Sequence, residues 1–258
     1  MRDLRLAQRP VMSSALRAGL GRLWMAAAPL LLAATADARL GDRQKGAAAG
    51  REPAPVTLAY GSDPLQRIDV WQADGRAGPA PLVLFVHGGA WKHGNKDNAS
   101  SRWLPAHLRR QGYTYASIDY RLVPAVAVEQ QGEDVAHALK ALLDRARAFG
   151  IDRDRVVLMG HSAGAHLVAL VGTDERYLQS AGLRFADVAG VIANDGAAYD
   201  VPAQMREDAR WMRRTYAEVF GTDPARQRAL SPTAQAVAPN VAAFLLLHVQ
   251  RPDGVLQP

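Results

Sequence analysis

Two short glycine-containing segments carry the groups that could perform acyl-transfer chemistry. Residues 160–164 read GHSAG and place Ser162 directly after an apolar, strand-like run and directly before an apolar, helix-like stretch. A serine at a sharp turn from strand to helix is held in a strained conformation, with its hydroxyl exposed at the helix N-terminus. The sequence therefore predicts that Ser162 is a nucleophile, with the Ala163 N–H and the helix dipole beside it to stabilise an anion.

The second segment is HGGAW at residues 87–91, which follows the apolar run PLVLFV. Negative charge develops on the carbonyl oxygen during acyl transfer, and a glycine loop lets backbone N–H groups reach that oxygen because no side chain blocks them. Gly88 and Gly89 are therefore predicted to form an oxyanion hole. His87 is a conceivable general base, but its place at the end of a strand favours a structural role in shaping the loop.

An alternation of strands and helices must position these two segments. Continuous apolar runs are typical of parallel strands buried on both faces, and an amphipathic pattern over 133–149 predicts a helix that Gly150 ends. The predicted strands are a hairpin of 56–60 and 67–73, followed by 81–87, 114–120, 155–160, 188–194 and 242–249. This order predicts an α/β protein with a doubly wound, mostly parallel sheet and helices on both faces.

A polar, mostly helical insertion is predicted near residues 199–239, within a folded domain of residues 56–258. Four large apolar side chains in it could line a substrate pocket, but their helical spacing is equally that of a packing face, which we favour. These side chains are Trp211, Met212, Tyr216 and Phe220. The identity of the substrate does not follow from this segment.

Three motifs together resemble a known superfamily. HGGAW, IDYRL at 118–122 and GHSAG occur in the order and spacing of the α/β-hydrolases. The resemblance is narrower to their esterase branch, which includes hormone-sensitive-lipase-like, feruloyl-esterase-like and arylformamidase-like proteins. It implies a serine hydrolase that cleaves carboxylic esters, or a related acyl bond, through an acyl-enzyme intermediate without cofactor or metal. The residue roles that it implies are Ser162 as nucleophile, Gly88, Gly89 and Ala163 as oxyanion hole, and Tyr120 and Arg121 as structural supports.

A catalytic acid is expected after the next-to-last strand, where it would orient a histidine and stabilise its charged form. The segment FLLLHVQRPDGV offers Asp253 in the loop after such a strand. Asp195, which follows the strand of residues 188–194, is the competing candidate. The chain order of nucleophile, acid and histidine in the superfamily favours the later carboxylate.

No histidine follows Asp253, although the family's general base lies some tens of residues beyond the acid. The last strand and helix of the expected fold are also missing. We therefore expect this sequence to be a truncated form of a longer protein. The alternative is a catalytically inactive α/β-hydrolase-like binding protein, which a fluorophosphonate probe distinguishes because only an activated serine reacts.

The N-terminus has the pattern of an export signal. Five arginines precede the apolar stretch LWMAAAPLLLAATADA, whose last residues have the small side chains that a signal peptidase recognises. We expect a signal peptide over residues 1–38 with cleavage after Ala38, a linker over 39–55, and a periplasmic or secreted protein. An anchoring helix is the alternative, although the apolar stretch is short for a membrane span.

Composition limits the remaining possibilities. The 258 residues are 48% hydrophobic and 22% charged, as in ordinary globular domains. The absence of cysteine excludes disulfides, zinc–thiolate sites and thiol catalysis. No basic run interleaved with aromatic residues indicates nucleic-acid binding. We expect a small-molecule ester or acyl substrate, no nucleic-acid partner and no stable membrane span after signal cleavage, while the oligomeric state is not predicted.

Overall fold

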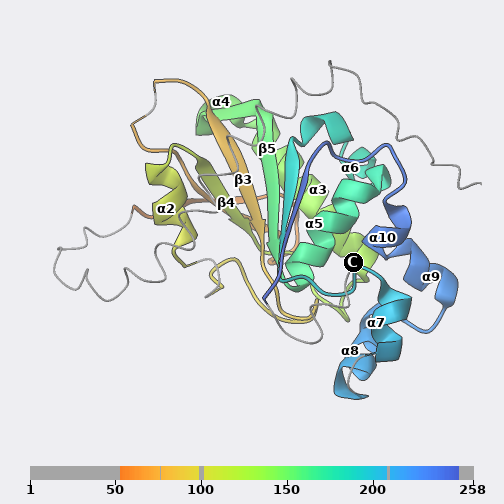
Figure 1. Cartoon of the computed structure of the whole chain (residues 1–258). Helices are drawn as coiled ribbons and strands as arrows, with labels where there is room; N and C mark the ends of the chain where they lie inside the picture. Colours follow the sequence, from red (N-terminus) through yellow and green to blue (C-terminus); the bar gives the residue numbers. More distant parts are fainter. Residues whose placement is uncertain (1–52, 76, 99–101, 208–209, 250–258) are drawn as a thin grey trace, which may run out of the picture. The chain divides into compact units, whose positions relative to one another are not determined.

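The computed structural model describes residues 53–249 except 76, 99–101 and 208–209 (Figure 1). The predicted signal peptide (1–38), most of the predicted linker (39–55) and Asp253 lie outside the described residues. No helix within the described residues has the length and apolar character needed to cross a membrane.

A seven-stranded sheet forms the centre of the described fold, in the order β1-β2-β4-β3-β5-β6-β7. The strands are β1 (Val56–Ala59), β2 (Arg67–Trp71), β3 (Ala80–Val86), β4 (Thr114–Ile118), β5 (Ile151–His161), β6 (Gly190–Asn194) and β7 (Phe244–Leu247). The hairpin of β1 and β2 is antiparallel and joins β4 in antiparallel pairing, whereas β4, β3, β5, β6 and β7 are mutually parallel. The predicted α/β fold with a mostly parallel sheet is confirmed.

Helices cover both faces of this sheet. The helices of the described part of the chain are α2 (Leu104–Arg110), α3 (Val128–Asp144), α4 (Ala146–Phe149), α5 (Ala163–Thr173), α6 (Glu175–Ser180), α7 (Val201–Glu207), α8 (Arg210–Phe220), α9 (Pro224–Ala229) and α10 (Pro232–Gln235). Helix α2 lies on one face, and α3, α5 and α6 lie on the other (Figure 1). The chain runs from β3 to β4 in one direction and then back past β3 to β5, so right-handed crossovers place the connecting helices on opposite faces.

The central strands are buried because both faces are covered. In β3, residues 82–86 are at most 1% exposed, and every residue of β4 is buried. Strands β3 and β5 pair in register up to Val86 and Gly160. The segments that follow them therefore leave the sheet side by side at its carboxyl edge. This is the point where the strand order reverses, and binding sites of open α/β sheets lie there.

Three predicted elements differ from the structure. Strand β5 begins at Ile151, four residues before the predicted start at residue 155. The expected helix 133–149 is α3, which begins earlier at Val128, and the separate short helix α4, which ends at Gly150 with φ 60°. The prediction of a buried strand over 242–249 is wrong, because β7 spans only four residues and leaves Phe244 38% and Leu246 53% exposed. Strand β7 ends the strand order of the described sheet, so it has a neighbour on one side only.

Candidate active site

Ser162 forms the turn between β5 and α5. Its backbone has φ 54° and ψ −119°, a conformation that a non-glycine residue keeps only when its surroundings enforce it. The Ser162 N–H donates to the carbonyl of Asn194 at the end of β6, at 3.0 Å, and the Ser162 carbonyl accepts the N–H of His166 at 3.1 Å. Every residue of α5 is buried, whereas Ser162 is partly exposed. The serine thus stands at the open N-terminus of a buried helix.

The glycines on either side of Ser162 allow this tight turn. A Cβ on Gly164 would lie 2.1 Å from the Val86 carbonyl oxygen and 2.5 Å from that of His87. A Cβ on Gly160 would lie 2.2 Å from the carbonyl oxygen of Gly164. Because the obstacles are backbone atoms, α5 can pack this closely on the end of β3 only without side chains at these positions.

The loop after β3 lies against the Ser162 turn. A Cβ on Gly88 would lie 3.0 Å from the Ser162 Cβ, so the two segments touch. Gly89 has φ +134°, and its carbonyl accepts the N–H groups of Lys92 and His93 at 3.1 and 2.9 Å. Within the described part of the chain, the N–H groups of Gly88, Gly89 and Ala163 make no loop or cap hydrogen bond to a backbone carbonyl. The structure therefore places Gly88 and Ala163 next to Ser162, and Gly89 is the next residue of the same loop.

His87 supports this loop from its buried side. Its ring is 1% exposed and stacks on Tyr120 with ring centroids 4.3 Å apart. Nδ1 lies 2.8 Å from the Gly88 carbonyl oxygen, which can only accept, so Nδ1 carries the hydrogen. The Tyr120 hydroxyl donates to the His87 carbonyl at 2.9 Å. Burial lowers the pKa of His87 to about 4, so the ring is neutral near pH 7.

His166 is also committed to structural contacts. Its Nδ1 accepts the Trp91 indole N–H at 3.2 Å, and its Nε2 lies 2.8 Å from the Leu230 carbonyl oxygen, to which it donates. Burial lowers its pKa to about 4. Trp91 packs edge-on against His166, Tyr216 and Phe220, all of them buried. Tyr216 and Phe220 thus belong to a packing face, as favoured from their spacing, and Met212 packs against the same core.

The structure describes only one of the two candidate acids, Asp195. Asp195 directly follows β6 with φ 49°, and its N–H donates to the Leu247 carbonyl at 2.6 Å. It is one residue beyond Asn194, whose carbonyl accepts the Ser162 N–H. Asp253 lies outside the described residues, so the choice between the two stays a prediction. Among the described residues, no cluster of three or more histidine, aspartate or glutamate side chains could hold a metal ion.

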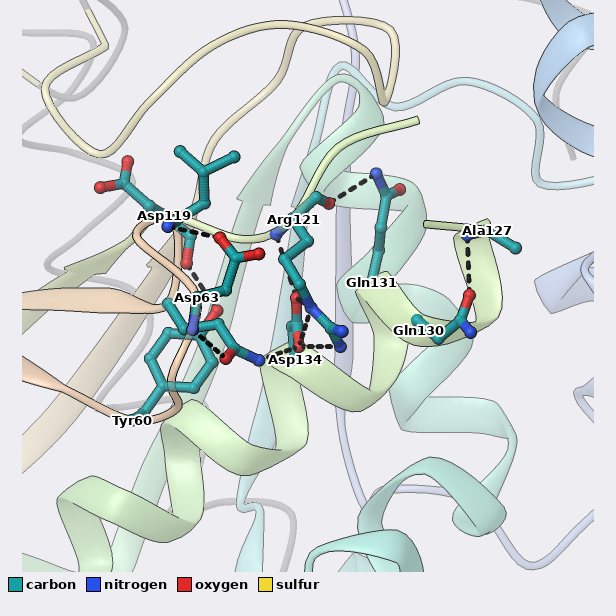
Figure 2. A network of polar contacts seen from close by, with 10 residues as sticks. Tyr60, Asp63, Asp119, Arg121, Ala127, Gln130, Gln131 and Asp134 are labelled. Carbon is teal, nitrogen blue, oxygen red and sulfur yellow. Dashed lines mark hydrogen bonds and ion pairs between the residues drawn. The ribbon is translucent and has the colours of Figure 1, made fainter. Parts of the chain in front are cut away.

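Sequence analysis missed two buried polar residues of α3 that support the site. Asp134 is fully buried and accepts hydrogen bonds from the Arg121 backbone N–H (3.0 Å), Nε (2.9 Å) and Nη2 (2.7 Å), and from Gln66 Nε2 at 2.9 Å (Figure 2). Gln131 is fully buried one turn earlier. The available signal was the apolar stripe of Val135, Leu139 and Leu142, which continues backwards onto these polar positions.

Fold and site together define the class of protein. A parallel sheet that carries a strained serine after one central strand and a glycine loop after the neighbouring strand is the arrangement of the α/β-hydrolases. Residues 68–253 match the BD-FAE family model, and the chain belongs to this esterase family of the α/β-hydrolase fold.

Curated relatives are similar over part of their length. The chain is 40% identical to Esterase LipC of Mycobacterium tuberculosis over 116 residues, which are 45% of this chain and 28% of that protein. It is 36% identical to a kynurenine formamidase of Drosophila melanogaster over 114 residues, 44% of this chain and 36% of the relative. The matches thus span only about a third or less of these relatives.

Solved structures agree with the fold. Esterase B from Lactobacillus rhamnosis superposes with a TM-score of 0.67 at 24% identity, over 92% of this chain and 78% of that chain. A putative thioesterase from a Silicibacter species superposes with a TM-score of 0.63 at 26% identity, over 80% and 71% of the two chains.

Proposed function

We propose that the protein is a serine hydrolase that cleaves carboxylic esters, or a related acyl bond, through an acyl-enzyme intermediate. The observation that carries this proposal is the strained backbone of Ser162 with the Gly88 loop packed against it. Such a conformation costs roughly 1–3 kcal/mol, and strain of this kind concentrates at functional sites. Family membership and the relatives named as esterases and formamidase support the same class of reaction.

The arrangement performs acyl transfer in two stages. The Ser162 Oγ attacks the substrate's carbonyl carbon while a general base takes the hydroxyl proton, and the carbonyl oxygen becomes negative. The N–H groups of Gly88, Gly89 and Ala163 donate to this oxygen. The carbon–oxygen bond to the alcohol then breaks and the alcohol leaves with the proton. Water repeats the attack on the acyl-serine and releases the acid.

The general base is neither of the two buried histidines. Both ring nitrogens of His166 are occupied, and the Nδ1–H of His87 is held by Gly88. Their lowered pKa values make both rings poor proton acceptors. We propose that Asp253, with Asp195 as the competing candidate, orients the imidazole that does act as base.

A fluorophosphonate probe tests the proposal, because it forms a stable adduct only with an activated serine. Expressed from its full-length gene, so that any residues beyond position 258 are included, the protein should take up one probe per chain, with the adduct on the peptide that contains Ser162. Ser162→Ala should abolish labelling. Ser180→Ala is the matched control, because Ser180 is exposed at the end of α6 and only donates to the carbonyl of Tyr177. An unlabelled wild-type protein, or an adduct on another residue, would show that the proposed function is wrong.

A further inference from the structure

The buried amide of Gln131 joins two loops at the site. Its Nε2 donates to the Trp91 carbonyl at 2.8 Å and to the Arg121 carbonyl at 2.9 Å. Because both partners can only accept, the orientation of the amide is fixed. Its Oε1 has no hydrogen-bond partner among the described residues. A buried amide that leaves its oxygen unsatisfied in order to place both hydrogens on loop carbonyls calls for a reason beyond packing.

The loop that Gln131 holds is strained. Ala90 and Trp91 have φ 52° and 61°, and Gly89 before them has φ +134°. Non-glycine residues in this region cost free energy and persist only where surrounding contacts determine the backbone. The Trp91 indole is pinned by His166, and its carbonyl accepts from Gln131 and, at 3.0 Å, from the Val123 N–H. These contacts fix the orientation of the peptide groups that follow Gly88.

The other partner of Gln131, Arg121, is itself held by several hydrogen bonds. Asp134, one turn further along α3, holds Arg121 through three donors. Figure 2 shows Gln131 and Asp134 on the same helix, with Arg121 hydrogen-bonded to both. The Gln131 amide therefore links the strained Gly88–Trp91 loop to the Arg121 segment, which Asp134 holds in place.

We propose that Gln131 is a positioning residue for the oxyanion hole: its amide holds the Gly88–Trp91 loop so that the loop's N–H groups face the substrate's carbonyl oxygen beside Ser162. This inference rests on the proposed function. It predicts a loss of transition-state stabilisation rather than of substrate binding, because Gln131 lies behind the loop.

The test compares Gln131→Met with Gln130→Met in the full chain. Methionine fills the same volume but donates no hydrogen bond, and the Val123 N–H still holds the Trp91 carbonyl, so the loop loosens without unfolding. Gln130 is exposed on the same helix and caps the Ala127 N–H, away from the loop. The rate of fluorophosphonate labelling should fall about 10- to 100-fold in Gln131→Met and stay near wild type in Gln130→Met. With p-nitrophenyl acetate, kcat should fall while KM changes less than about twofold.

Gln131→Glu is a second variant, with a side chain of the same shape. Its readout is the pH dependence of the labelling rate, which a role in packing alone would not change. Burial raises the pKa of such a carboxyl, so lowering the pH protonates it and restores one donor. The labelling rate of Gln131→Glu relative to wild type should rise as the pH falls from about 8 to about 6.

The outcomes separate this inference from the proposed function. If the wild-type protein takes no label, the proposed function is wrong and the inference falls with it. If the wild type is labelled and Gln131→Met is labelled equally fast, only the inference is wrong. A rise in KM without a fall in kcat, or a pH-independent ratio for Gln131→Glu, would also overturn it.

Discussion

Backbone strain in the described residues is confined to one edge of the sheet. Five non-glycine residues have positive φ: Ala90 and Trp91 after β3, Ser162 after β5, and Asp195 and Ala198 after β6. All five follow the carboxyl ends of three neighbouring strands. Strained residues cluster at functional sites, where the contacts of the surrounding structure keep the backbone in its strained conformation.

A substitution at Gly164 tests the close packing of α5 at this edge. Gly164→Ala places a Cβ about 2 Å from backbone carbonyls of β3, and α5 must shift away. We expect the free energy of unfolding, measured by urea denaturation, to fall by roughly 1–3 kcal/mol, with fluorophosphonate labelling of Ser162 slowed.

Gly78→Ala is the matched control for that change. A Cβ on Gly78 meets nothing within 4 Å, and this glycine has no positive φ. Its stability should be unchanged or rise by up to about 1 kcal/mol, because alanine restricts the unfolded chain. Equal stability of both variants would contradict the packing that we describe.

The sequence identified the residues whose chemistry and turn requirements are local. Ser162 between two glycines and the pair Gly88 and Gly89 are recognisable because each forms a short motif directly after an apolar, strand-like run. Gln131 was not recognisable, since its partner Trp91 lies 40 positions away. The helix was also predicted to begin at residue 133, which left Gln131 outside it.

At the level of elements, α3 supports the site. Its buried side provides Gln131 and Asp134, while its last turn carries an exposed ion pair between Lys140 and Asp144 at 2.5 Å. The helix thus offers a buried and an exposed carboxylate, each paired with a cation.

Asp134→Asn should destabilise the protein far more than Asp144→Asn. The first change leaves the Arg121 guanidinium without its carboxylate and should lower the free energy of unfolding by roughly 2–3 kcal/mol. This is below the range for a fully buried pair, because the Arg121 side chain is 26% exposed. The second breaks a surface pair and should cost at most about 0.5 kcal/mol. Chemical denaturation of both variants measures the difference, and equal losses would contradict the assigned role of Asp134.

Strands were predicted well where both of their faces are buried. Apolar runs identify β3, β4 and β5 because helices cover both faces of each strand. The same argument fails for β7, whose sequence FLLL is as apolar as theirs although Leu246 is 53% exposed. An apolar run reports what a strand can bury, and the neighbours of the strand determine what it does bury.

At the scale of the whole molecule, the two buried neutral histidines make stability depend on pH. His87 and His166 have pKa values lowered by burial to about 4, whereas an unfolded histidine titrates near 6.5. The unfolded chain therefore binds protons first as the pH falls. Their contribution to stability is complete above pH 6.5 and is lost between about 6.5 and 4.

Urea denaturation at pH 7 and pH 5 tests this dependence. Each histidine should lower the free energy of unfolding by about 2 kcal/mol over that interval. His166→Gln should weaken the pH dependence by about that amount. Gln130→Met, which changes an exposed side chain that does not titrate, should keep the wild-type dependence. An unaltered slope in His166→Gln would show that His166 is not the neutral, buried group described.

The position of β3 between β4 and β5 also has a consequence for how the protein is made. On the ribosome, the Gly88–Trp91 loop is synthesised about 70 residues before Ser162. Chain synthesis proceeds at roughly 5–20 residues per second, so the strand that will lie beside this loop follows on the order of ten seconds later. Tyr120, Val123 and then Gln131 emerge during that interval, so the contacts that bend the loop are available before β5 pairs with β3. The two halves of the site are therefore separated in time as well as in sequence, and the groups that hold the backbone carbonyls of the earlier half are made before the later half.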